Sequence, residues 1–388
     1  MQHEAKEIKP GDLIELENGG QLYVFSCEQP KEGYDSDDMF YRPFCSYDEI
    51  DRIKGMRNIE DYLLFLRAEV VAEHTRIMRV VLRRMREAGD NWVFSESFND
   101  SHFSECLSEL ERKKRRLARK IKAGYLFSKS LYGRIQRTKF GDLILVTESM
   151  YNFLYYMNLA FVSFDEGEEV PFDVKEHALL IGIRIMLGVE AQDFELDPRG
   201  VIPQNIHLRN KHICEEQIKF IIGHEYAHFF LGHLDKNSTY TISAQVRRHK
   251  TEHVYYTVRQ KDEFAADLHS LAAPSLPAKK LTSRAYYAML FFMYVDMFEQ
   301  VEHQIYPPKN SIKTHPAPLD RMLLIAEKFN CKASINLQSQ ADYLLKLSAA
   351  VKHRLQGEVA TNINLFEFYG SVYLGSWRGP ALVDRVDY

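Results

Sequence analysis

The chain has 388 residues, of which 45% are hydrophobic and 27% are charged, and its formal net charge is -4 at pH 7. These values are typical of a soluble globular protein with a large core, divided into two or three domains or subdomains. The small negative charge speaks against a general attraction to nucleic acid or to an anionic membrane.

The cysteine pattern and the N-terminus indicate a cytoplasmic protein. The five cysteines are widely spaced and form no C-x-x-C, which favours a reducing compartment and thiols that serve mostly as packing residues. The polar N-terminus shows no secretory signal. The two longest apolar runs, 178–189 and 285–295, are shorter than the ~20 residues of a membrane span, so we expect core helices and no membrane contact. The cysteines are Cys27, Cys45, Cys106, Cys214 and Cys331.

The N-terminal region predicts a β-hairpin followed by helices. Residues 9–26 alternate in hydrophobicity on both sides of the turn sequence Asn18-Gly19-Gly20, a pattern typical of a hairpin. Residues 28–45 are polar and irregular. Helical spacing of leucines and valines then extends over 47–87, with a break near Gly55.

A basic segment follows, and we expect it on a helix over 104–123. One interpretation is a surface for nucleic acid or for an acidic partner. The other is a solvated helix face, and the acidic charge of the whole chain favours this second interpretation. The basic residues are Arg112, Lys113, Lys114, Arg115, Arg116, Arg119, Lys120 and Lys122.

The middle of the chain alternates between predicted strands and helices. Residues 142–147 and 159–164 are apolar runs that predict strands, and the tyrosine-rich 150–158 and the apolar 174–187 predict helices. A link that contains proline and glycine covers 197–204. We expect the main domain boundary within 124–140.

The segment from His224 to His233 carries the pattern H-E-x-x-H in an apolar stretch that predicts a helix. Because four residues are about one helical turn, His224 and His228 project from the same face and can share one metal ion. Glu225 lies beside that face, where it can accept a proton from a water molecule. A five-residue pattern also occurs by chance, so a third ligand has to be found.

Two sources of a third ligand have little support from the spacing. In the extension H-E-x-x-H-x-x-G-x-x-H the last position is Leu234 here, and His233 is one residue short of it. If the helix continues, His233 points nearly opposite His224, which favours a structural or supporting role. The loop that follows offers His249, Glu252 and His253, but nothing in the sequence positions them.

A third source is the segment 262–267, which we expect on a helix. Glu263 and Asp267 are four residues apart and share a face. Glu263 can reach the metal ion, and Asp267 can orient a ligand histidine through the free N–H of its ring. Ala265 and Ala266 would let this helix approach the first one closely. We prefer this source, and the alternative is an acidic pair on the surface.

The sequence Thr314-His315-Pro316 precedes another predicted helix. A histidine before a proline is held in an extended conformation, and His315 could donate a hydrogen bond to the oxyanion of a tetrahedral intermediate. Arg321 could hold a carboxylate or the backbone of a substrate. The alternative is an ordinary helix N-terminus that Thr314 caps.

The patterns H-E-x-x-H, E-x-x-A-D and T-H-P-x-x-x-x-R, in this order over about 211–325, resemble the gluzincin metallopeptidases. The HtpX-like and CAAX prenyl protease group is the most similar. The resemblance implies a catalytic glutamate at Glu225 and one Zn²⁺ per chain, bound by His224, His228 and Glu263. It also implies that Asp267 supports a histidine, and it matches His315 and Arg321 to the later element of the family.

The resemblance implies an α+β, mostly helical fold with a zincin-like metallopeptidase domain. We place this domain at 131–335. The hairpin and helices of 1–130 would select the substrate or regulate the site. A C-terminal helix and short strands, 336–388, would pack on the core.

The HtpX-like group is embedded in membranes, whereas this chain shows no span. The Lit-type phage-exclusion peptidases and the ImmA/IrrE-type regulators are soluble proteins with similar motifs. The first cleave a host translation factor, and the second promote cleavage of a repressor. We therefore expect an endopeptidase with one intracellular protein substrate, a protein activator or inhibitor, and a role in phage defence or stress regulation. Two alternatives are a regulatory protein with a structural zinc site and a nucleic-acid-associated factor that uses 112–122.

Overall fold

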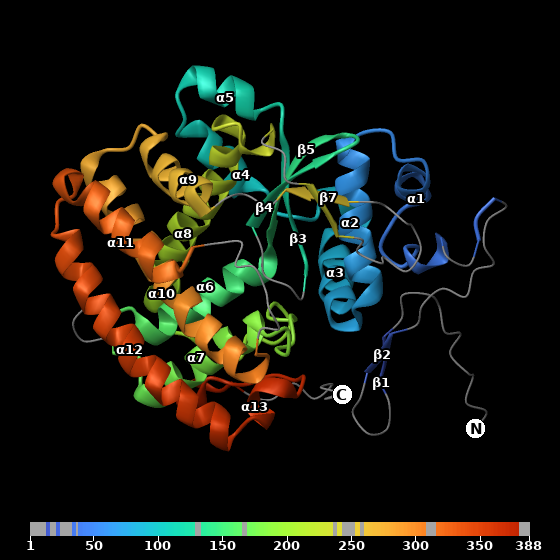
Figure 1. Cartoon of the computed structure of the whole chain (residues 1–388). Helices are drawn as coiled ribbons and strands as arrows, with labels where there is room; N and C mark the ends of the chain where they lie inside the picture. Colours follow the sequence, from blue (N-terminus) through green and yellow to red (C-terminus); the bar gives the residue numbers. More distant parts are fainter. Residues whose placement is uncertain are drawn as a thin grey trace, which may run out of the picture.

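Helices dominate the described part of the computed structural model, and the strands in this part form three small sheets (Figure 1). This confirms the α+β, mostly helical fold class. Of the helices described, none combines the length and the apolar character that crossing a membrane requires. The structure describes residues 13–15, 21–23, 33–35, 38–128, 133–164, 169–235, 239–242, 253–256, 260–307 and 316–379.

The N-terminal region has the predicted order of a hairpin and then helices. Strand β1 (Leu13–Glu15) pairs antiparallel with β2 (Gln21–Tyr23), which confirms the hairpin. Helices α1 (Tyr47–Lys54), α2 (Ile59–Glu73) and α3 (Thr75–Ala88) follow. A capping box between Ser46 and Glu49 starts α1, and α1 ends at Gly55, where the sequence predicts a break.

The single helix predicted over 104–123 is wrong. Two short helices, α4 (Ser101–Ser108) and α5 (Arg112–Ala118), precede a strand, β3 (Lys122–Leu126). The strand forms because 122–126 pairs in parallel with a strand further along the chain. Gly124 has no room for a side chain, since an added Cβ would lie 2.8 Å from Nη2 of Arg67. Long-range pairing of this kind overrides local helical periodicity.

The central sheet has the strand order β3-β5-β4, with β4 at Gly133–Thr138 and β5 at Gly141–Thr147. The predicted strand over 142–147 is confirmed, and its residues 143–146 are fully buried, as expected of a strand covered on both faces. Strands from both sides of residue 130 share this sheet and one continuous core. The predicted division into domains at residue 130 is not tested by these contacts and stays a prediction.

The strand predicted over 159–164 is also wrong, because α6 (Glu148–Phe161) continues through its first half and no strand follows at 162–164. Residues 153–160 of α6 are all buried, against α7 (Phe172–Met186) and α8 (Gln204–Phe230) among others. A short apolar run has the same composition in a buried strand and in a buried helix, so periodicity cannot separate the two. The helix predicted over 174–187 is confirmed as α7.

The second half of the chain is a layered group of helices around α8 and α10 (Figure 1). It comprises α9 (Gln260–Ala272), α10 (Ala278–Ile305), α11 (Pro318–Phe329), α12 (Leu337–Thr361) and α13 (Asn364–Glu367). The hairpin of β6 (Thr239–Ile242) and β7 (His253–Tyr256) lies between α8 and α9 in the sequence. The C-terminal helix is confirmed as α12, but up to residue 379 the predicted C-terminal strands amount to one isolated bridge, between Glu190 and Gly370.

Candidate metal centre

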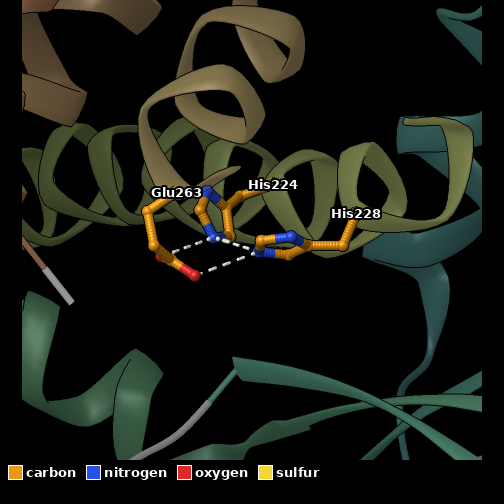
Figure 2. Close-up of side chains that lie close together, drawn as sticks. All are labelled: His224, His228 and Glu263. Atoms are coloured by element: carbon orange, nitrogen blue, oxygen red, sulfur yellow. Dashed lines mark hydrogen bonds and ion pairs between the residues drawn. The ribbon is translucent and has the colours of Figure 1, made fainter. Parts of the chain in front are cut away.

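Helix α8 presents both histidines of the H-E-x-x-H pattern toward a common point (Figure 2). The Nε2 atoms of His224 and His228 are 2.9 Å apart, as expected of residues one turn apart on a helix. Their side chains are buried, with 8% of His224 and 3% of His228 exposed.

Helix α9 brings Glu263 to the same point. Its carboxylate oxygens lie 3.4 Å from Nε2 of His224 and 3.5 Å from Nε2 of His228. Two ligand atoms bound tetrahedrally at 2.0–2.2 Å from one zinc ion are roughly 3.4 Å apart, so these distances fit a shared ion. The three ligand atoms lie within 4.8 Å of one another and can hold a metal ion. The structure thus places Glu263, the preferred third ligand, beside the two histidines.

Close packing of α8 on α9 makes this meeting possible. An added Cβ at Gly223 would lie 3.3 Å from Cβ of Ser270, and Ala266 is completely buried. Small side chains on both helices therefore bring the two backbones together, as the alanines of 262–267 predict.

Asp267 lies behind His224 and is held by Arg321. The Nδ1–H of His224 donates to Oδ1 of Asp267 over 2.9 Å, which directs the Nε2 lone pair of the ring to the metal position. Arg321, from α11, donates to both oxygens of Asp267 over 2.6 and 2.7 Å. The guanidinium also stacks on Phe292, 4.5 Å from the ring centre. Of the two roles predicted for Arg321, the structure shows the contact with a carboxylate.

His233 is not among the converging ligand atoms of the described residues, as predicted, but its position differs from the prediction. Helix α8 ends at Phe230, and a turn with Gly232 at φ +67° leads into the short 3₁₀ helix that starts at His233. The ring returns toward α8, where its Nδ1 lies 2.9 Å from Nδ1 of His228. His233 therefore orients the second ligand histidine.

Asp262 completes this second arrangement, and sequence reasoning missed it. Its Oδ1 lies 3.6 Å from Nε2 of His233, and both side chains are buried. In the sequence only its place beside Glu263 pointed to Asp262. Its pairing with His233 could not be predicted, because this pairing depends on how the chain returns from α8 to α9.

Burial and neighbouring charges shift the pKa values of the two ligand histidines in opposite directions. Burial acts to lower the pKa of His224, but the hydrogen bonds that its ring donates to Asp267 and Glu263 outweigh burial and raise this pKa to about 10. For His228, burial and then the charge of His224 lower the pKa to about 2. Without a metal ion His224 is thus an imidazolium at neutral pH, and a cation would displace one of its two ring protons.

Glu225 lies beside the three ligands and against the edge strand β4. Burial raises its pKa to about 7, and the backbone N–H of Ile135 opposes this shift with a hydrogen bond. Gly133 allows β4 to come this close, since an added Cβ would lie 2.7 Å from Cγ2 of Ile221 and 3.4 Å from Oε1 of Glu225. The role of β4 as a wall of the site was not predicted.

Several candidate residues are not tested by the structure. His315, Thr314, His249 and Glu252 lie outside the described residues, and of His253 only the backbone, in β7, is described. The oxyanion role of His315 therefore stays a prediction.

No protein-family model matches the sequence, and no curated protein and no solved structure matches it. Any statement on function therefore depends on the residues of the site and on their geometry.

Proposed function

We propose that this protein is a zinc-dependent endopeptidase of the gluzincin type, with a zincin-like domain around α8 and α9. One observation carries the proposal. His224, His228 and Glu263 direct three ligand atoms to one point, and a buried carboxylate with a pKa of about 7, Glu225, lies directly beside them.

The number of ligands favours a catalytic site over a structural one. Structural zinc sites are usually closed by four protein ligands, whereas catalytic sites use three and leave one position for water or substrate. In the described part of the chain three ligand atoms converge. The donor set of two imidazoles and one carboxylate also suits zinc.

The chain supplies the proton transfers and the orientation of the site. A zinc ion, when bound, would polarise the scissile carbonyl and lower the pKa of a water molecule. Glu225 accepts the proton of the attacking water and passes it to the leaving amine. A pKa near 7 suits both steps, since a general base works best when its pKa is near the ambient pH. Asp267 and His233 hold the ligand rings in the required orientation.

We further propose a cytoplasmic protein with a narrow protein substrate and a role in phage defence or stress regulation. The thiols of Cys45, Cys106 and Cys214 are buried and reduced, as in a packing role. They support a reducing compartment.

The Glu225→Gln variant tests the proposal. The amide cannot accept a proton, so we expect loss of cleavage while one zinc ion per chain remains bound. Zinc content by elemental analysis and a comparison of new protein N-termini in cells that make wild type or variant measure both. Cleavage that persists in the variant would exclude Glu225 as the base, and wild-type protein without zinc would exclude the metal.

A further inference from the structure

The basic segment forms a compact positive surface on and after α5, which we call the α5 patch. Its residues are exposed, and residues four apart among them share a helix face. Within the described chain none of them has a carboxylate partner, and Glu111 is the one acidic residue between 110 and 122. The α5 patch consists of Arg112, Lys113, Arg116, Arg119 and Lys120.

Two carboxylates before Glu111 in the sequence, those of Glu109 and Glu105, already have partners of their own. Glu109 accepts from Arg284 over 2.6 Å and from Lys280 over 2.7 Å. Glu105 pairs with Lys219 over 2.7 Å. The positive charge of the α5 patch is therefore not compensated from within this part of the fold, although the whole chain is acidic.

Helix α5, which carries part of the α5 patch, contacts the helix of the ligand Glu263. Nζ of Lys114, next to the patch residue Lys113, contacts Nε2 of His269 over 3.3 Å, and the ring of His269 is 5.9 Å from that of Phe230. Phe230 ends α8 two residues after the ligand His228, and His269 follows the ligand Glu263 by six residues, about 9 Å along α9. The α5 patch thus adjoins the same two helices that carry the metal ligands.

We propose that the α5 patch binds an acidic segment of the protein substrate while the scissile bond lies at the metal centre. This proposal rests on the proposed peptidase function and names the substrate class as a protein with an acidic stretch close to the cleavage site. Pairing with two to four carboxylates needs only the length of α5, about 10 Å.

Nucleic acid fits this surface less well. The chain carries a net charge of -4, so the remaining surface repels a long polyanion. No aromatic residue occurs between 110 and 124 to stack on bases. A duplex would also extend far beyond a helix of seven residues.

The test is a binding measurement on the full chain in the Glu225→Gln background, so that no peptide is cleaved. The probe is a fluorescein-labelled twelve-residue peptide with six glutamates, and its counterpart has glutamine at these positions. We expect the acidic peptide to bind more tightly, with an affinity that falls as salt screens the charges. The Arg112→Gln/Lys113→Gln/Arg116→Gln variant should bind it about tenfold more weakly.

A matched variant removes three exposed cations elsewhere, Arg57→Gln/Lys328→Gln/Lys346→Gln, and should bind the acidic peptide like the parent. Equal binding of the two peptides, or equal losses in the two triple variants, would overturn the proposal. Tighter binding of a twenty-nucleotide single strand than of the acidic peptide would overturn it in favour of nucleic acid. Because binding is measured without cleavage, a negative result leaves the peptidase proposal standing, and failure of that proposal shows only in the cleavage experiment.

Discussion

The two ligand histidines sit one turn apart on the same helix, yet their surroundings differ. His224 is held by Asp267, a carboxylate on the neighbouring helix α9, which Arg321 fixes in turn. His228 is held by His233, an imidazole ring on a turn, with Asp262 behind it at 3.6 Å. One support is a carboxylate on a helix, and the other is an imidazole that lies where a helix ends.

This difference shows how one helix can carry two ligands with opposite affinity for protons. The carboxylates near His224 raise its pKa to about 10, whereas burial and the neighbouring charge lower that of His228 to about 2. A metal ion therefore competes with a proton at one ligand and not at the other. Proton release, support of His224 and support of His228 can be tested separately.

The largest expected effect is the pH dependence of zinc binding. Below a pH of about 10 His224 is an imidazolium, with both ring nitrogens protonated, and zinc must displace one of these protons. The affinity for zinc therefore rises with pH. Displacement of one proton changes the zinc affinity about tenfold per pH unit, or about a hundredfold between pH 6 and 8. Competition with a chelator of known affinity measures the slope, after correction for the chelator's own protonation. An affinity independent of pH would show that the site binds zinc without releasing a proton.

Removing the support of His224 comes next in size. In Asp267→Asn the amide keeps the shape of the side chain but loses its charge. We therefore expect the zinc affinity at pH 8 to fall by up to about a hundredfold. The slope between pH 6 and 8 should flatten, because the pKa of His224 falls with the lost carboxylate. Arg321 is left without its main partner in a buried place, which costs about 3 kcal/mol of unfolding free energy. Urea unfolding of the metal-free proteins measures this cost.

The Lys328→Gln change on the same helix as Arg321 is the control for Asp267→Asn, and it should alter neither quantity. An unchanged pH slope in Asp267→Asn would mean that Asp267 is not the source of the raised pKa.

Sequence reasoning predicted the support of His224 but not the support of His228. Glu263 and Asp267 share a face of one helix, so local periodicity predicts their joint role. Asp262 and His233 come together only because α8 stops at Phe230 and the chain turns back, which depends on where a helix ends. Helix ends are the least determined part of a periodic pattern.

The fold shows the same limit. The class and the longest helices follow from composition and periodicity, but the helix predicted over 104–123 overlaps the start of β3, whose partner β5 lies about twenty residues away. The strand that covers Glu225, β4, was not predicted either. Side chains of one helix can thus be assigned from sequence, whereas walls formed by sheet pairing cannot.

The smallest expected effect concerns the support of His228. In His233→Ala the Nδ1–H of His228 loses its acceptor, and its ring is no longer held with Nε2 toward the metal position. Because His233 only orients the ring of His228, we expect a loss of zinc affinity of about tenfold, the lower end for groups that orient a ligand. The pH slope should stay as in wild type, since His224 keeps its carboxylate. Chelator competition at pH 6 and 8 measures both.

Asp262→Asn sharpens this last comparison. At 3.6 Å its contact with His233 is longer than a hydrogen bond, so the loss of affinity should be smaller than in His233→Ala. A loss as large as in Asp267→Asn would mean that Asp262 acts through its charge, and the two halves of the centre would then be equivalent. A small loss with an unchanged slope would show that the ring of His233 alone is enough to hold a ligand that has no proton to release.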